Sequence, residues 1–366
     1  METSYREMVL TKNKSGGLLL LKVLLLLLVT MAGCRRSEVY YGIDDFRKVP
    51  KTDAHFHYLT RDTGIMVLVG ELNFRLLTPV WEGEEVSIDT QMAIASSIHK
   101  QYPERYAYLA TFPTTGIRDP DFAPATIQYI RARMAEGASG VKIWKNIGMV
   151  LRWPDGRYVM VDDPVFAPVF EYLQQEHIPV TGHLGEPRNC WLPLDQMTDR
   201  GDAAYYEAHP QYHMFLHPEV PSYELQLRAR DKLLARYPSI DFTGAHLGSM
   251  EWNLGEVAAR LDRFPNFNVD LAARMGHVMR QSAINREKVR EFFINYQDRI
   301  LYGTDQEAHD QEDVSPSDRK NQLRQTWFRD WLYLATDSVV SGVRGLQLPA
   351  SVLDKIYQEN ASRFYK

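Results

Sequence analysis

The sequence predicts an α/β protein, and specifically a (β/α)8 or TIM barrel that occupies residues 49–366. From Val49 onward, short apolar runs alternate with amphipathic segments of helical length, and this alternation occurs eight times. Strands that alternate with helices form parallel βαβ units, and eight such units favour a closed barrel over an open sheet. The length of 366 residues leaves room for a second domain, but one barrel often fills more than roughly 250 residues.

The predicted strands are short and rich in apolar residues. In chain order they are 51–57, 74–81, 106–112, 140–144, 178–183, 240–246, 267–271 and 299–305. The predicted helices are 88–102, 122–136, 165–176, 223–237, 254–264, 287–296, 320–334 and 351–364. Three longer connections follow strands, at 145–163, 184–222 and 306–319. Barrel enzymes place their chemistry at this end of the strands, so we expect a partly covered pocket there.

Residues 1–33 are excluded from the barrel because they resemble a lipoprotein signal peptide. Two lysines precede an apolar run from Leu18 to Met31, which is shorter than the roughly 20 residues that span a bilayer. The run ends in Met-Ala-Gly-Cys34, similar to the lipobox at which bacterial lipoproteins are cleaved and acylated. We therefore expect lipid on Cys34, a tether over 34–48, and a barrel outside the cytoplasm, anchored to a membrane of a bacterial cell envelope. An uncleaved single-span anchor is the alternative.

The composition argues against a nucleic-acid partner and against an intramolecular disulfide. The net charge is −5 and the pI is about 6.1, without the stripe of Lys and Arg that nucleic-acid binding needs. If Cys34 carries lipid, Cys190 is the only thiol left, so no intramolecular disulfide forms. We interpret Cys190 as a loop or packing residue rather than as a nucleophile. The oligomeric state stays open, with a homo-oligomer among the options.

Five polar residues at predicted strand ends indicate a metal centre. His55 and His57 are two apart on a strand, so both imidazoles point to the same face. His183, His246 and Asp305 each end another predicted strand, which brings all five to one rim. Imidazole and carboxylate ligands suit zinc or a similar divalent ion. Such an ion lowers the pKa of bound water towards about 7, which makes hydroxide available near neutral pH.

Motifs in the same order resemble the amidohydrolase superfamily. They are Asp53-Ala-His-Phe-His57, Gly140-Val-Lys142, Thr181-Gly-His-Leu-Gly-Glu186, Gly244-Ala-His-Leu-Gly248 and Leu301-Tyr-Gly-Thr-Asp305. The chain is most similar to the amidohydrolase-related branch (amidohydrolase 2), which contains aminocarboxymuconate-semialdehyde decarboxylase and several lactonases. The resemblance runs from about residue 50 to 366 and includes Asn360-Ala-Ser-Arg-Phe364. It is specific for the superfamily and much less so for the substrate.

The resemblance implies a role for each of these residues. His55, His57, His183 and Asp305 would be the metal ligands, and in this branch one ion is usual, which we expect to be Zn²⁺. His246 would orient or activate the attacking water, and Asp305 would also accept its proton. Some relatives bind two metals bridged by a carbamylated lysine of the fourth strand, where Lys142 lies. We expect one metal, with Lys142 holding a substrate carboxylate or pairing with a buried acid.

Other rim residues are candidates for binding the substrate. Together with Lys142 they are Trp144, Arg188 and Arg274, and Asp270, Glu186, Lys145 and Asn146 are weaker candidates. Arginine is well shaped to grip carboxylates, so a small anionic or polyhydroxylated substrate fits this set. Solvent-facing loop charge is the alternative for each. His209, His213 and His217 are spaced by four, and on a helix they would share one face.

The leading functional prediction is a metal-dependent hydrolase that cleaves an ester, lactone or amide bond with activated water. The first alternative is a metal-dependent non-oxidative decarboxylase that uses the same ligands. The second is a surface protein that binds a small molecule through a barrel whose chemistry has lapsed. The presence of all five polar residues argues against the second alternative.

Overall fold

The computed structural model describes residues 38–83, 86–309 and 314–365. The signal peptide and Cys34 lie outside these residues, so lipidation stays a prediction. Within the described ranges, we find no helix with the length and apolar character that a membrane span requires. The second half of the predicted tether is part of the barrel body, because the Tyr41 hydroxyl donates to Asp354 and Phe46 is buried in the core.

Eight short parallel strands form the centre of the fold. They are β1 (Lys51–Asp53), β3 (Phe74–Pro79), β4 (Tyr106–Leu109), β5 (Val141–Ile143), β6 (Val180–Gly182), β7 (Phe242–Gly244), β8 (Phe267–Asp270) and β9 (Ile300–Leu301). Three pair in the order β1-β3-β4 and five in the order β5-β6-β7-β8-β9. Every one of these pairs is parallel.

Backbone hydrogen bonds join the edges of these two sheets. At the seam between β4 and β5, Ala110 bridges Val141, and the Lys142 N–H donates to the Ala110 carbonyl at 2.6 Å. At the seam between β9 and β1, the Asp305 N–H donates to the His55 carbonyl at 2.7 Å. The strands therefore follow one another around a ring in chain order, which confirms the (β/α)8 prediction.

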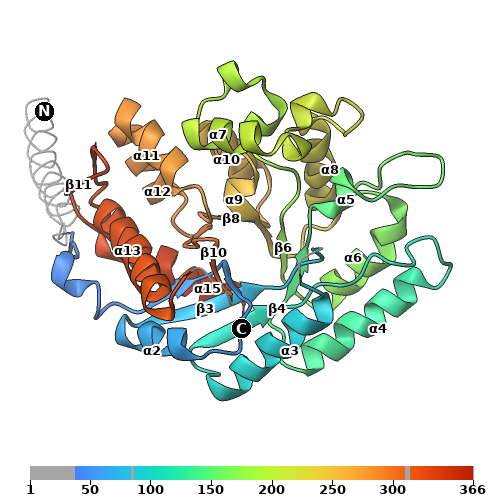
Figure 1. Cartoon of the computed structure of the whole chain (residues 1–366), viewed down its shortest axis with the longest axis horizontal. Helices are drawn as coiled ribbons and strands as arrows, with labels where there is room; N and C mark the ends of the chain where they lie inside the picture. Colours follow the sequence, from blue (N-terminus) through green and yellow to red (C-terminus); the bar gives the residue numbers. More distant parts are fainter. Residues whose placement is uncertain (1–37, 84–85, 310–313, 366) are drawn as a thin grey trace, which may run out of the picture. The chain divides into compact units, whose positions relative to one another are not determined.

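Helices surround the strands (Figure 1). They are α2 (Gly64–Glu71), α3 (Ile88–Gln101), α4 (Phe122–Ala135), α5 (Asn146–Met149), α6 (Ala167–Gln175), α7 (Arg200–Ala208), α8 (Tyr223–Arg236), α9 (Ala245–Gly248), α10 (Leu254–Arg263), α11 (Met275–Ile284), α12 (Arg286–Asn295), α13 (Pro316–Ala335), α14 (Ala350–Asp354) and α15 (Asn360–Phe364). Side-chain caps start several of them: Ser87, Ser222 and Ser315 each accept the backbone N–H three residues later. In the first turn of α13, Pro316 supplies a fixed φ where no N–H is needed.

Several parts of the structure differ from the predicted elements. The first predicted strand divides into β1 and β2 (Phe56–Tyr58), and β2 pairs with β10 (Gln306–Ala308). The helices α2, α7 and α11 were not predicted. The predicted terminal helix contains a π-helical turn at Lys355–Glu359 between α14 and α15. A small antiparallel pair, β11 (Val339–Val340) and β12 (Val343–Arg344), follows α13.

The last residues of the chain fill the inside of the barrel. Phe364 and Tyr365 pack with inward-facing residues of the strands, among them Leu77, Leu109 and Leu301. The Tyr365 hydroxyl lies 2.6 Å from the Thr181 hydroxyl on β6 and donates to the Thr243 hydroxyl on β7 at 2.9 Å. The inside of the barrel is therefore a packed core, in which the Tyr365 hydroxyl joins the neighbouring strands β6 and β7.

Candidate metal centre

Two histidines and one carboxylate meet at the C-terminal ends of β1 and β9. One ligand atom from each of His55, His57 and Asp305 lies within 4.8 Å of the others. Asp305 Oδ1 is 3.1 Å from His57 Nε2 and 3.4 Å from His55 Nε2. Both histidines are buried, while the Asp305 side chain keeps 28% of its surface exposed. The cluster is thus open on the carboxylate side.

His183 and His246 lie beside this cluster. His183 Nδ1 is 3.2 Å from His246 Nε2, and the His246 ring centroid is 4.9 Å from that of His55. His246 Nδ1 lies 4.0 Å from Asp305 Oδ2. The five residues predicted from the sequence are therefore brought together, although the tight ligand group contains three of them and not His183.

Asp270, at the end of β8, supports two of the histidines. Its Oδ2 lies 2.8 Å from His55 Nδ1, and its Oδ1 accepts the His246 backbone N–H at 2.7 Å. A proton on His55 Nδ1 leaves Nε2 as a free acceptor directed at the cluster. His246 Nδ1 is held in the same way, 2.9 Å from the Ala272 carbonyl. Asp270 was only a weak candidate from sequence, and it proves to orient the centre.

The contact between His183 and His246 fits a bound cation. If His183 carries its proton on Nε2, the unprotonated nitrogens of the two rings face each other at 3.2 Å. If the proton is on Nδ1, the free Nε2 faces the Glu186 carboxylate at 3.8 Å and has no hydrogen-bond partner. Either arrangement leaves electron-rich atoms facing each other, which a positive charge between them would relieve.

Protonation states also suit metal ligands. Burial lowers the pKa of His183 to about 3, and it lowers the pKa values of His55 and His246 as well. Burial acts to raise the pKa of Asp305, but the nearby His246 and His55 and the contact with His57 hold it well below its usual value. Neutral imidazoles and an ionised carboxylate are the forms that bind a divalent cation.

The chain was compared with known proteins. The amidohydrolase family model matches residues 53–366. The chain belongs to the amidohydrolase family. The search of curated proteins found no match. Two solved structures share the fold of this amidohydrolase. One is an amidohydrolase II, with 17% sequence identity and a TM-score of 0.50. The other is 2,6-dihydroxybenzoate decarboxylase from Rhizobium, with 16% sequence identity and a TM-score of 0.52. The matches cover 86% of this chain and 99% of the first structure, and 87% of this chain and 98% of the second.

The family match makes the protein an enzyme of the amidohydrolase superfamily, which is metal-dependent. A divalent ion is supported by the family and by the cluster of His55, His57 and Asp305. At 16–17% identity, the two structures show the fold alone.

Lys142 of this amidohydrolase reaches the cluster from β5. Its Nζ lies 3.4 Å from His55 Nε2, and the side chain is fully buried. Burial lowers the pKa of its ammonium to about 8, although Asp270 and Asp305 act in the opposite direction. The lysine therefore belongs to the site and not to a solvent-facing loop, as its position on the strand predicts.

Two tryptophans and an ion pair border the centre. Trp81 lies 4.5 Å from the His57 ring centroid and 6.2 Å from Trp144, which in turn lies 4.9 Å from His183. Lys145 forms an ion pair with Glu186 beside His183. Trp81 was missed from the sequence, although its place directly after β3 and Val80 matches that of the other site residues.

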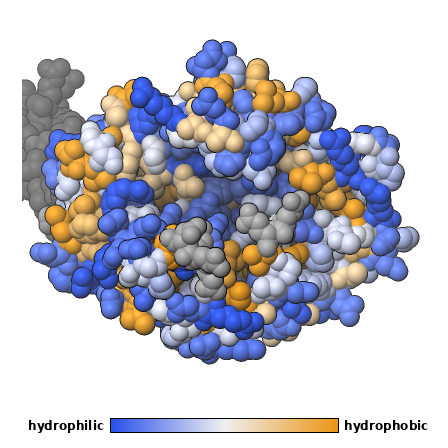
Figure 2. Space-filling view, in the orientation of Figure 1, coloured by the Kyte–Doolittle hydropathy of each residue, from blue (hydrophilic) through white to orange (hydrophobic). Residues whose placement is uncertain are grey.

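A hydrogen-bonded loop network holds this side of the rim. The Glu82 carboxylate accepts the Thr114 N–H and hydroxyl, each at 2.8 Å, and the Asn146 amide at 2.6 Å. Glu82 thus joins the segments that follow β3, β4 and β5. It was also missed from the sequence, because one exposed-looking glutamate in a loop carries no recognisable pattern. Figure 2 shows that one face of the molecule is hollowed near its middle, with a hydrophilic floor.

The two arginines predicted to bind substrate lie farther out. The Arg188 guanidinium stacks 4.3 Å from the Trp252 ring, and the Arg188 N–H donates to Glu251. Arg274 is half-buried, and its positive charge helps to lower the pKa of His246, after burial and His183. Among the described contacts, neither guanidinium bonds to the histidine–carboxylate cluster. Of the two, Arg274 remains the better candidate for a substrate anion.

The prediction that three loop histidines share one face of a helix is wrong. α7 ends at Ala208, and His209, His213 and His217 lie in the 3-10 turns that follow it. His213 Nε2 contacts the Leu192 carbonyl at 2.7 Å, and His217 Nε2 contacts the Pro210 carbonyl at 3.1 Å. Proline at position 210 starts a new turn instead of extending the helix. These histidines are tied to the backbone of their own loop.

Cys190 agrees with its interpretation as a packing residue. It is buried, and its thiol donates to the Tyr212 carbonyl at 3.0 Å. Burial raises the pKa of the thiol to about 12, so the thiolate needed for nucleophilic attack is absent near neutral pH.

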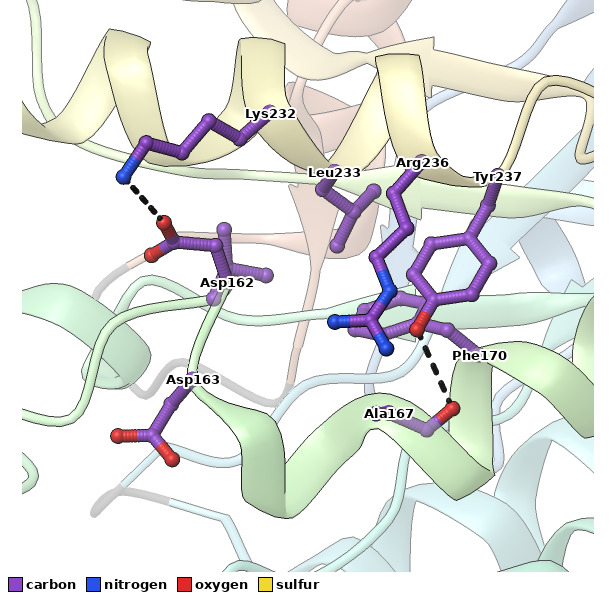
Figure 3. A pocket seen from close by; sticks show the side chains of 9 residues that line it. Asp162, Asp163, Ala167, Phe170, Lys232, Leu233, Arg236 and Tyr237 are labelled. Atoms are coloured by element: carbon purple, nitrogen blue, oxygen red, sulfur yellow. Dashed lines mark hydrogen bonds and ion pairs between the residues drawn. The ribbon is translucent and has the colours of Figure 1, made fainter.

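Two other features do not extend the site. Asp199, Asp202 and His277 form a second group of possible ligands, but Arg280 lies 3.3 Å from His277 Nδ1, which directs the ring's N–H toward Asp202 and leaves no free nitrogen for a metal. A pocket between α6 and α8 is shown in Figure 3. Lys232 forms an ion pair with Asp162 in it, and none of the predicted site residues lines it.

Proposed function

We propose that the protein is a metal-dependent hydrolase that cleaves an ester, lactone or amide bond of a small molecule. One observation carries the proposal. Asp305 Oδ1 is directed at His55 and His57, and Asp305 Oδ2 lies 4.0 Å from His246 Nδ1. One carboxylate can therefore hold a cation through one oxygen and accept a proton through the other.

The ligand set has the composition that a mononuclear centre needs. His55, His57, His183 and Asp305 would hold the ion, for which we propose Zn²⁺. When bound, a divalent ion supplies Lewis-acid polarisation of a carbonyl and lowers the pKa of water.

The chain's own residues supply the proton transfer and the orientation. Asp305 Oδ2 accepts a proton from the attacking water, because its low pKa keeps the carboxylate ionised. His246 keeps its proton on Nδ1, against the Ala272 carbonyl, so its unprotonated Nε2, 3.2 Å from His183 Nδ1, is left to accept a hydrogen bond from the water. Lys142 places a buried positive charge near the cluster, where an oxyanion or a substrate carboxylate would be stabilised.

Turnover of a substrate panel by the variant Asp305→Asn tests the proposal. Loss of the acid–base group should lower kcat for lactone and ester substrates by about 10²- to 10⁴-fold. Asp298→Asn is the matched control, because that carboxylate is exposed and pairs with Lys355. Absence of hydrolysis by the metal-loaded wild type over lactones, esters and amides would overturn the proposal.

A non-oxidative decarboxylase is the second candidate, and the pair of indoles favours it. Trp81 and Trp144 form an aromatic border beside His57 and His183, with the Lys145 ammonium 5.0 Å from the Trp144 ring. Flat side chains of this kind suit a planar carboxylate. The Rhizobium enzyme that shares the fold decarboxylates a dihydroxybenzoate. Release of carbon dioxide from aromatic carboxylates, without hydrolysis of any ester, would support this reading.

We also propose that the enzyme is a lipoprotein acylated at Cys34 and held outside the cytoplasm. The support is the sequence Met31-Ala-Gly-Cys34 after an apolar run. Labelled fatty acid should enter the wild type and not the variant Cys34→Ala. Equal labelling of both proteins would exclude Cys34 as the acylated residue.

A further inference from the structure

α9, the short turn that carries His246, is left-handed and not an ordinary right-handed helix at four consecutive residues. The φ angles of His246, Leu247, Gly248 and Ser249 are 58°, 56°, 61° and 59°. Single residues adopt this conformation in many proteins, but a run is disfavoured because each Cβ approaches the next carbonyl. A conformation of this kind persists only where the surroundings determine it.

Two side chains of α8 hold the end of this turn. Arg230 Nη1 donates to the Gly248 carbonyl at 2.6 Å, and the Tyr223 hydroxyl donates to the Ser249 carbonyl at 2.6 Å. Both side chains are buried, with 1% and 5% of their surface exposed. A buried guanidinium needs acceptors, and Arg230 finds them in this carbonyl and in Asp231. The turn thus supplies the contact that lets a charged side chain remain inside.

The packing around Gly248 is too close for a side chain. A Cβ at this position would lie 3.0 Å from Arg230 Nη1 and 2.9 Å from the Phe267 ring. Arg230 in turn lies 4.9 Å from the centroid of that ring. The guanidinium is therefore fixed between the turn and β8, with little freedom to move.

The same turn is tied to the segment after β6 that bears His183. The Ser249 hydroxyl donates to the Gly185 carbonyl at 3.0 Å. At its other end, the turn places the His246 N–H on Asp270 and His246 Nδ1 against the Ala272 carbonyl. Loss of the left-handed geometry would break both of these contacts and rotate the imidazole away from the cluster.

We propose that Arg230 and Tyr223 are positioning residues, which hold the left-handed turn and so keep the His246 ring beside the metal centre, with Nδ1 on the Ala272 carbonyl and Nε2 directed at His183. Neither residue touches the cluster itself. The effect on orientation stands by itself, whereas the effect on turnover rests on the function proposed above for His246.

Three variants and two controls test the proposal in the full-length protein. Arg230→Met removes the donor to Gly248, and Arg230→Lys restores one donor. Tyr223→Phe removes the donor to Ser249 and keeps the ring, so the fold is disturbed least. Arg228→Met and Tyr237→Phe are matched controls, on α8 and at its C-cap: Arg228 is exposed, and the Tyr237 hydroxyl donates to the Ala167 carbonyl at 3.4 Å, away from the turn.

The first readout is the ring-nitrogen NMR spectrum of histidine-labelled protein, with His246 assigned by its loss in His246→Gln. Wild type should show an Nδ1-protonated His246 whose proton exchanges slowly. Arg230→Met and Tyr223→Phe should lose this signature while circular dichroism shows a folded protein, and Arg230→Lys should recover it in part. An unchanged His246 signal in both Arg230→Met and Tyr223→Phe would overturn the proposal.

The second readout is steady-state kinetics of the metal-loaded enzymes. We expect kcat to fall about 10- to 100-fold in Arg230→Met and Tyr223→Phe, with KM little changed, as for residues that orient a catalytic group. The controls should match wild type. If the NMR signature is lost but kcat stays at the wild-type value, the positioning inference stands and the catalytic role of His246 fails.

Discussion

His55 Nδ1 lies 2.8 Å from Asp270 Oδ2, and the other oxygen of the same carboxylate accepts the backbone N–H of His246 at 2.7 Å. One buried side chain therefore sets the tautomer of a proposed metal ligand and the position of a proposed catalytic histidine. Both sit at the ends of strands that are far apart in the sequence. The centre depends on this carboxylate although it does not contact the proposed ion.

Asp270→Asn should weaken the binding of a divalent ion by about 10- to 100-fold, because an amide accepts hydrogen bonds at only one of its two polar atoms, so the group that orients His55 is lost. Competition with a chelator measures the affinity. Asp241→Asn is the control, since that exposed carboxylate lies just before β7, at the opposite end from the site. Equal affinities of Asp270→Asn and wild type would show that His55 needs no such partner.

Lys142→Met separates one-metal from two-metal chemistry. With a single ion, the ion content should stay the same, and KM for an anionic substrate should rise because a buried positive charge beside His55 is gone. Elemental analysis and kinetics check the two parts. A fall from two ions to one in the variant would instead place a carbamylated lysine between them.

Tyr365→Phe should lower the free energy of unfolding by about 1 to 3 kcal/mol, because the hydroxyls of Thr181 and Thr243 lose their shared partner inside the barrel. Denaturant unfolding measures this difference. Tyr296→Phe is the control, since its hydroxyl binds Asp262 at an exposed position. A Tyr365→Phe protein as stable as wild type would mean that the C-terminal bridge contributes nothing.

Lys51 should make stability depend on pH. Burial lowers its pKa from 10.5 to about 7, and a neutral amine has the two N–H groups that it donates to the Phe46 and Val49 carbonyls. Between about pH 7 and 10.5 the unfolded chain keeps a proton that the folded chain has released, so stability rises with pH over this range. It is lost again as the pH falls towards 7. Denaturation of wild type and Lys51→Met should therefore diverge, with wild type gaining stability; parallel curves would contradict the lowered pKa.

The fold could be predicted because the barrel strands and most of the long helices each carry their own apolar pattern. The ends of the strands could not be predicted. His246 adopts a φ angle of 58° and Asp305 one of 63°, and sequence patterns do not indicate positive φ angles for these residue types. β7 and β9 therefore end before the residues that carry the chemistry. α2 was missed because its residues are almost uniformly apolar and include two glycines, a composition that shows no helical period.

The candidate ligands could be predicted because each follows a strand on the same rim. The residues that orient these ligands could not be predicted. Nothing in the sequence shows that Asp270 faces His55 rather than solvent, or that Arg230 on α8 reaches the carbonyl of Gly248. These contacts join elements distant in the chain, and they depend on the twist and packing of the whole barrel. The shared face of His209, His213 and His217 assumed one continuous helix. Pro210 begins a new 3-10 turn there instead.

The most direct measurement is the metal content of the purified protein and of the variants His55→Ala and His183→Ala, each confirmed to be folded. We predict about one divalent ion per wild-type chain by elemental analysis, and loss of most of it in both variants. Wild-type protein that holds no ion after purification and reloading would contradict the proposed centre. Full occupancy in either variant would contradict the ligand assignment.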